Sequence, residues 1–185
     1  LPYNQSKLYM GYRLNDLTKY ELDYVLRVYN TILGTMNDSI LFNIVREKHS
    51  LCYSIGSYTS KYNPSLTVYA GINKENYEKT VSLIKECFEM MKDRKELERL
   101  FDSAKKTINT YINNYYDDVV SQVNHYYYGQ FYPSEDIELY REKINEVVSK
   151  SDFDVKKTVK IIENYYISNM GGYNEWIDKY NSSNI

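Results

Sequence analysis

Two predicted strands, residues 51–59 and 66–72, restrict the fold of this 185-residue chain more than any other feature. In the second run the apolar residues fall on every second position: Leu66, Val68, Ala70 and Ile72. That period of two is typical of a strand with one buried face. Residues 60–64 join the runs and include the turn-forming pair Asn63-Pro64. A link this short predicts a hairpin, so at least part of the sheet is antiparallel.

Further elements are predicted on both sides of the hairpin. Residues 7–14 alternate like a strand. Thr18 and Glu21 have the spacing of a capping box, which predicts a helix that Gly34 ends in a left-handed conformation. Asp38 or Ser39 is expected to cap the next helix.

Beyond the hairpin, Asn73 is expected to cap a helix whose buried stripe includes Tyr77. A long helical pattern begins near Glu96 and carries Val119 and Val123 on its apolar side, with a break or bend at Asn113-Asn114 and a restart at Asp117. Two capping positions follow, Ser134 and Ser151, and residues 160–168 resemble a last strand.

The order of these elements is not a regular alternation of strands and helices. We therefore expect an α+β fold in which helices cover one face of a mixed, largely antiparallel sheet. The length suits a single domain, predicted at residues 1–172, and the polar residues 173–185 are interpreted as a tail or linker.

Composition excludes several classes of function. A net charge of −2 gives no attraction to nucleic acid, and no apolar run is long enough to span a bilayer. Two cysteines without metal or redox spacing favour a reducing compartment, so we expect a cytoplasmic protein. The 23 tyrosines suggest a carbohydrate- or peptide-binding surface, although codon usage in an AT-rich genome is the favoured explanation.

The usual catalytic motifs are absent from the sequence. Cys52 with His49 or His125 would make a thiol and its base, but its apolar neighbours favour a buried structural cysteine. The chain has two histidines and neither H-E-x-x-H nor H-x-x-E-H, so no metal site is predicted in it.

Arg46 and Tyr53 are the remaining candidates for a site. Arg46 lies near the end of the predicted short helix and Tyr53 lies early in the following strand. A guanidinium and a phenol on adjacent elements would form a clamp for a peptide carbonyl or an oxyanion. From the residues alone, an exposed Arg–Glu pair and a Tyr at the core edge are the preferred interpretation.

Residues 33–34, 39–48 and 51–54 read LG, SILFNIVREK and LCYS, and this pattern resembles the pitrilysin/insulinase family of zinc metallopeptidases. The similarity is to the non-catalytic domain of the family, the inactive or C-terminal type, and it extends over about residues 6–172. Small residues replace the family's usual Gly, Gly and Ala at Thr35, Ser50 and Cys52.

The resemblance implies a partner. A homologous half would carry zinc and the inverted motif H-x-x-E-H, and it would cut a peptide substrate. This half would be attached in cis or supplied in trans. A homodimer of this chain is the other arrangement that the resemblance allows. Tyr53 would donate to the scissile carbonyl oxygen and Arg46 would position the backbone or Tyr53. This chain alone would not hydrolyse peptides. The alternative is an inactive homologue that binds a peptide or protein in a bacterial maturation or modification pathway.

Overall fold

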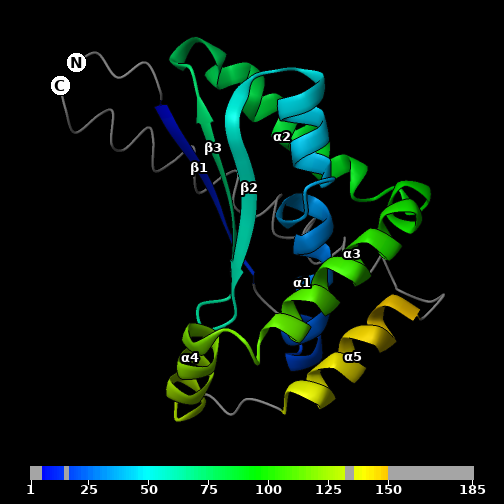
Figure 1. The fold of residues 1–185 in the computed structure, drawn as a ribbon. Helices are drawn as coiled ribbons and strands as arrows, with labels where there is room; N and C mark the ends of the chain where they lie inside the picture. The colour runs from blue at the N-terminus through cyan, green and yellow to red at the C-terminus, as the bar shows by residue number, and fades with distance from the viewer. Residues whose placement is uncertain (1–5, 15–16, 132–135, 150–185) are drawn as a thin grey trace.

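The computed structural model describes residues 6–14, 17–131 and 136–149. Figure 1 shows strands and helices that follow one another as β1 (Ser6–Arg13), η1 (Glu21–Val25), α1 (Leu26–Asn30), η2 (Thr31–Thr35), η3 (Phe42–Lys48), β2 (Cys52–Ser60), β3 (Ser65–Ile72), η4 (Lys74–Asn76), α2 (Tyr77–Met90), α3 (Arg94–Asn114), α4 (Val119–Gly129) and α5 (Ile137–Ser149). The predicted α+β class is confirmed.

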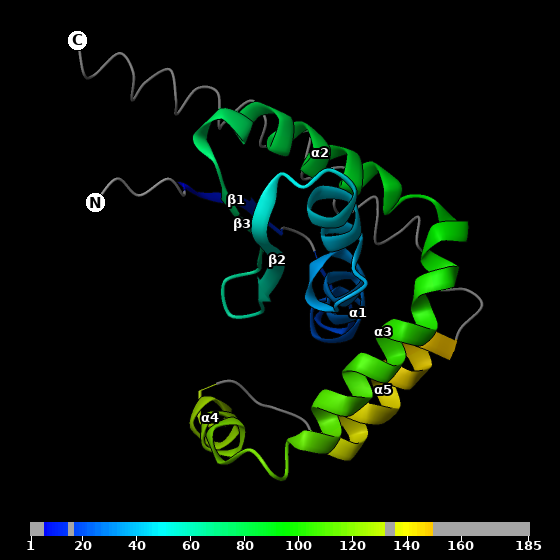
Figure 2. The same ribbon diagram turned by 45° about the horizontal axis from the view of Figure 1, so that its top comes forward.

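The three described strands form one sheet in the order β1-β3-β2, and both pairings are antiparallel. The predicted hairpin is β2 with β3. On one face Leu8 and Ile55 both lie opposite Ala70, and the alternating apolar residues of β3 are buried there. The helices cover this face, as Figure 2 shows, so the core lies between the sheet and the helices.

The first helical segment runs without interruption from η1 through α1 to η2, with wider π-helical turns at both ends. Its predicted capping box is confirmed: the Thr18 amide donates to Glu21 Oε2 at 2.9 Å, and the Glu21 amide donates to Thr18 Oγ1 at 3.3 Å. Val28 is completely buried, since the segment packs against both the sheet and other helices.

The predicted left-handed conformation of Gly34 is wrong. Its φ angle is not positive, and it lies within η2. A Cβ at this position would come within 2.5 Å of Ser57 Oγ, 2.7 Å of the Ser57 amide nitrogen and 2.8 Å of Leu41 Cδ1. Glycine is needed here because the helical segment lies directly against β2, not because the backbone turns.

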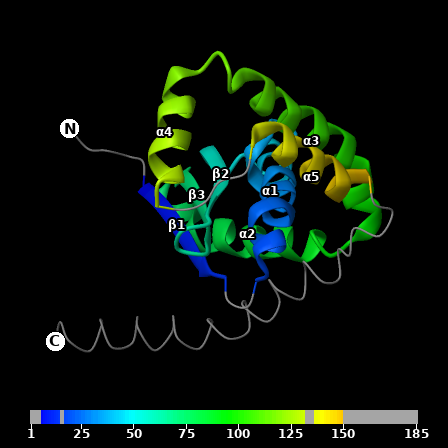
Figure 3. The same cartoon turned by 90° about the horizontal axis from the view of Figure 1, so that it is seen from below.

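The long helical pattern divides into two helices, and the prediction that Val119 and Val123 are buried is wrong. α3 ends at Asn114 as expected, and Asp118, one residue beyond the predicted Asp117, caps α4 through the Val120 amide at 3.2 Å. α4 then turns away from α3 and lies beside the hairpin (Figure 3), which leaves Val119 70% exposed and Val123 60% exposed.

One other detail differs from expectation. Tyr77 is exposed, because the buried stripe of α2 is centred on Ile84 and Cys87. Asp136 caps α5 by accepting from the Glu138 amide at 2.8 Å. The predicted cap at Ser134, the capping box at 151–154, the strand at 160–168 and the domain boundary at residue 172 all lie outside the described residues.

Candidate functional site

The turn between η3 and β2 places Arg46 and Tyr53 at the same end of the sheet. The Ser50 amide donates to the Arg46 carbonyl at 2.9 Å, and the Leu51 amide donates to the Val45 carbonyl at 3.1 Å. Ser39 caps the helix, with its Oγ 3.4 Å from the Phe42 amide, and so settles the choice between Asp38 and Ser39. These bonds fix where the helix ends and where the strand begins.

Ser50 has a φ of 52°, in the left-handed region that costs a non-glycine residue about 1–2 kcal/mol. We expect Ser50→Gly to raise the free energy of unfolding by about 0.5–1 kcal/mol, because glycine relieves this strain but adds freedom to the unfolded chain. Urea unfolding measures the change. The same substitution at Ser82, within α2, should lower stability by about 0.5–1 kcal/mol; destabilisation by both variants would contradict the prediction.

Arg46 packs on its own helix and stays accessible. Its guanidinium carbon lies 4.6 Å above the centre of the Phe42 ring, and its Nε lies 3.8 Å from Glu47 Oε1. The Arg46 side chain is 43% exposed, and an exposed ion pair of this kind holds it only weakly. The guanidinium can therefore turn its N–H donors toward a ligand.

Tyr53 occupies a β-bulge. Cys52 pairs with Ile72 and Ser54 pairs with Gly71, so Tyr53 is the extra residue of the ladder. Its side chain is 63% exposed, and its hydroxyl donates to Asn73 Oδ1 at 3.5 Å, a long and weak bond. The sequence predicted that the Asn73 side chain caps the following helix, and this prediction is wrong. The Asn73 side chain makes no capping hydrogen bond to η4, and its Oδ1 accepts from the Tyr53 hydroxyl instead.

The two side chains therefore contact different neighbours, Arg46 with Phe42 and Glu47, and Tyr53 with Asn73. They share one end of the sheet and they are both exposed. A phenol and a guanidinium presented in this way can donate to a carbonyl oxygen.

Cys52, between these two residues, is not a nucleophile. Burial raises the pKa of its thiol to about 11, and the positive charge of Arg46 offsets this only in part. The thiol therefore stays protonated near neutral pH. The preferred interpretation of a buried structural cysteine is confirmed.

The exposed face of the sheet carries tyrosines. Tyr9 of β1 lies opposite Tyr69 of β3, and the rings of Tyr58 and Tyr69 are 6.2 Å apart. The Tyr69 hydroxyl lies over Gly56, where a Cβ would come within 2.6 Å of it. We call Tyr9, Tyr58 and Tyr69 the tyrosine face; it is open to solvent.

Comparison with known sequences decides the family. Residues 2–108, more than half of the chain, match the family described as the peptidase M16 inactive domain. The chain belongs to this family. The resemblance inferred from residues 33–54 is therefore confirmed. The matched residues of this chain include the small residues Gly34 and Thr35 and the turn from Arg46 to Tyr53.

Two Bacillus subtilis (strain 168) proteins are similar to this M16 inactive domain. The probable inactive metalloprotease YmfF is 41% identical over 90 residues, and the uncharacterized zinc protease YmxG is 33% identical over 110 residues. The matches cover 48% and 56% of this chain but 21% and 27% of those proteins. The chain therefore spans about a quarter of the length of these relatives.

Solved structures share the fold. A conserved protein from Enterococcus faecalis V583 has a TM-score of 0.66 at 25% identity, covering 86% of this chain and 37% of that one. A peptidase M16 inactive domain from Pseudomonas fluorescens has a TM-score of 0.62 at 19% identity, covering 89% of this chain and 39% of that one. The domain is thus one part of larger polypeptides in these relatives.

The described residues of the chain include neither a group of metal-binding side chains nor a helix that could span a membrane. Within residues 6–14, 17–131 and 136–149, no group of three or more His, Cys, Asp or Glu side chains is arranged to hold a metal ion. No helix in the described part of the chain combines the length and the apolar composition that crossing a bilayer requires.

One polar network of the M16 inactive domain was not predicted. Ser57 Oγ donates to Asn30 Oδ1 at 2.7 Å, and Asn30 Nδ2 donates to Thr35 Oγ1 at 2.9 Å. Both Asn30 and Ser57 are buried, so the network joins the helical segment to β2 in the core. A polar residue inside the apolar stripe of residues 22–33 was the only signal in the sequence.

Proposed function

We propose that this chain is the non-catalytic domain of a zinc metalloendopeptidase and forms part of its substrate chamber. A separate homologous half would carry the zinc and the general base, either in the same polypeptide or as a second chain. The observation that carries the proposal is the pair of exposed donors, Arg46 and Tyr53, in an M16 inactive domain whose described residues include no metal-ligand group.

In this proposal Tyr53 would donate its O–H to the scissile carbonyl oxygen, where negative charge develops in the transition state. Zinc held by the other half would supply Lewis-acid chemistry when bound. Arg46 holds the peptide backbone or orients the Tyr53 hydroxyl. The tyrosine face supports an extended peptide, since exposed Tyr rings offer apolar contact with a polar end. Two buried cysteines that are not bonded to each other fit the cytoplasm that we propose as the compartment.

A second candidate is a binding scaffold without catalysis, in which neither half hydrolyses peptides. The specific observation in its favour is the 41% identity to a protein named as a probable inactive metalloprotease. In that case Arg46 and Tyr53 would hold a bound peptide and not a transition state.

Zinc content and peptide hydrolysis separate the two candidates. The full-length protein, purified with any homologous chain that accompanies it, is expected to contain zinc and to cut unstructured peptides. A chelator should abolish hydrolysis and added zinc should restore it. An assembly that holds a peptide stably, contains no zinc and cuts nothing would exclude the peptidase and favour the scaffold.

A further inference from the structure

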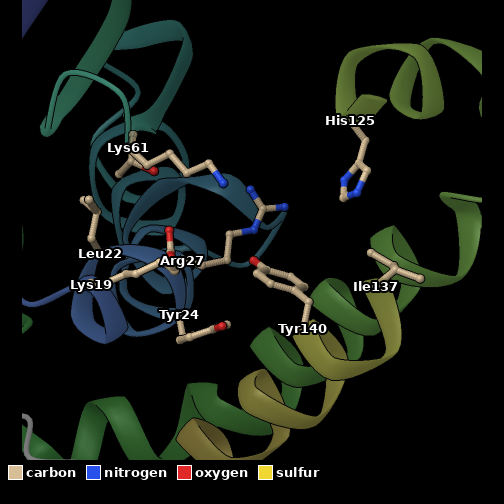
Figure 4. Close-up of a pocket in the computed structure, with 10 residues that line it drawn as sticks. Lys19, Leu22, Tyr24, Arg27, Lys61, His125, Ile137 and Tyr140 are labelled. Carbon is tan, nitrogen blue, oxygen red and sulfur yellow. The ribbon is translucent and has the colours of Figure 1, made fainter. Parts of the chain in front are cut away.

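The described part of the chain contains a cavity of about 320 Å³ at the far end of β2 from Tyr53. It opens between the first helical segment, the hairpin turn, α4 and α5 (Figure 4). Its volume is in the range of small-ligand sites. Tyr53 and Thr59, at the two ends, are six residues apart on β2, about 20 Å in an extended strand.

The cavity is positively charged in a chain whose net charge is −2. Its one carboxylate, Asp23, already forms an ion pair with Lys19. Among the described residues no carboxylate forms an ion pair with Arg27 or Lys61; their cationic groups each lie 5.5 Å from the centre of a tyrosine ring, Tyr111 and Tyr62 respectively. Arg27 and Lys61 therefore give this cavity two cations whose charge no described carboxylate balances through an ion pair.

Figure 4 shows the nitrogen ends of Arg27 and Lys61 pointing into the same space, with the Tyr140 hydroxyl directed toward Arg27 and the His125 ring facing them from α4. Like charges that converge repel each other, and an anion between them would remove that cost. Burial raises the pKa of Tyr140, so its hydroxyl keeps its proton and can donate. Leu22 and Ile137 supply apolar wall.

We propose that this cavity binds a carboxylate of an acidic peptide. The guanidinium of Arg27 can donate two parallel N–H bonds to the two carboxylate oxygens, while Lys61 and Tyr140 donate from the sides. The apolar wall accommodates the methylene groups of a Glu side chain, which inorganic phosphate lacks. The inference rests on the proposed function only in taking the ligand to be a peptide.

Calorimetric titration of the full-length protein at fixed salt tests the site. The probes are acetyl-Glu-Glu-Glu-amide, the matched Gln peptide and inorganic phosphate. We expect the Glu peptide to bind at least about tenfold more tightly than the Gln peptide, and Lys61→Gln to weaken Glu-peptide binding about tenfold. Lys61 is exposed in a turn, so this variant keeps the fold. Arg27→Lys keeps the charge, removes the bidentate geometry and should also weaken binding.

The matched control is Lys79→Gln, which removes the same charge from the exposed side of α2 and should change the affinity by less than about twofold. Equal affinities for the Glu and Gln peptides, no binding of the Glu peptide, binding of phosphate alone, or equal effects of the two Lys→Gln variants would each overturn the proposal. Because affinity is measured without hydrolysis, a failure here is distinct from a failure of the peptidase proposal, which is decided by zinc and turnover.

Discussion

Tyr53→Phe is expected to lower kcat of the assembled peptidase by about 10²–10³-fold and to change KM by less than about twofold. The substitution removes one hydroxyl and keeps the ring. If that hydroxyl donates to the carbonyl oxygen only as negative charge develops, its loss affects the transition state and not the bound substrate. Stability should be unchanged, since the side chain is 63% exposed and its hydroxyl makes only a 3.5 Å bond to Asn73.

The control for this experiment is Tyr116→Phe, which removes a hydroxyl from another exposed tyrosine, far along the chain from the site. Steady-state kinetics with one peptide substrate measure both variants. A kcat for Tyr53→Phe equal to that of the unmodified enzyme would exclude the donor role. A rise in KM at constant kcat would place Tyr53 in ground-state binding of the substrate instead and would also contradict the donor role.

Gly34→Ala is expected to lower the free energy of unfolding by about 2–3 kcal/mol, through overpacking. The added methyl would lie 2.7 Å from the Ser57 backbone nitrogen, so the strand or the helical segment must move. That movement would also stretch the buried bond between Ser57 and Asn30. The melting temperature should fall by about 4–12 °C for a chain of this length.

Gly11→Ala provides the control, because a Cβ on Gly11 meets nothing within 4 Å. We expect that variant to stay within about 0.5 kcal/mol of the parent protein. Urea unfolding of both variants, with the m-value compared, makes the measurement. Equal effects of the two substitutions would show that close contact at Gly34 does not determine stability.

The sequence predicts well what neighbouring residues determine. The capping box of Thr18 and Glu21 forms because both partners lie within one helical turn. The strands of the hairpin follow from alternation and a short turn. Arg46 and Tyr53 are brought to one end by a link of a few residues, although the role that we propose for them came from the family resemblance and not from the residues alone.

What the sequence does not predict depends on residues distant along the chain. Gly34 is constrained by Ser57, which lies on a strand, while its position after a helix suggests an ordinary helix end. Val119 is exposed because α4 turns away from α3, a direction that no local pattern specifies. Arg27 and Lys61 line one cavity only after the hairpin turn is placed beside the helix, so neither stands out in the sequence.

Tyr53 lies in a β-bulge and has no partner residue in the pairing of β2 with β3. Cys52 and Ser54 pair with adjacent residues of β3, Ile72 and Gly71, so the ladder would be regular if Tyr53 were deleted. A single codon can therefore add or remove the tyrosine without altering the alternation of either strand. Such a position lets the hydroxyl that we propose as a donor be gained or lost while the domain continues to fold.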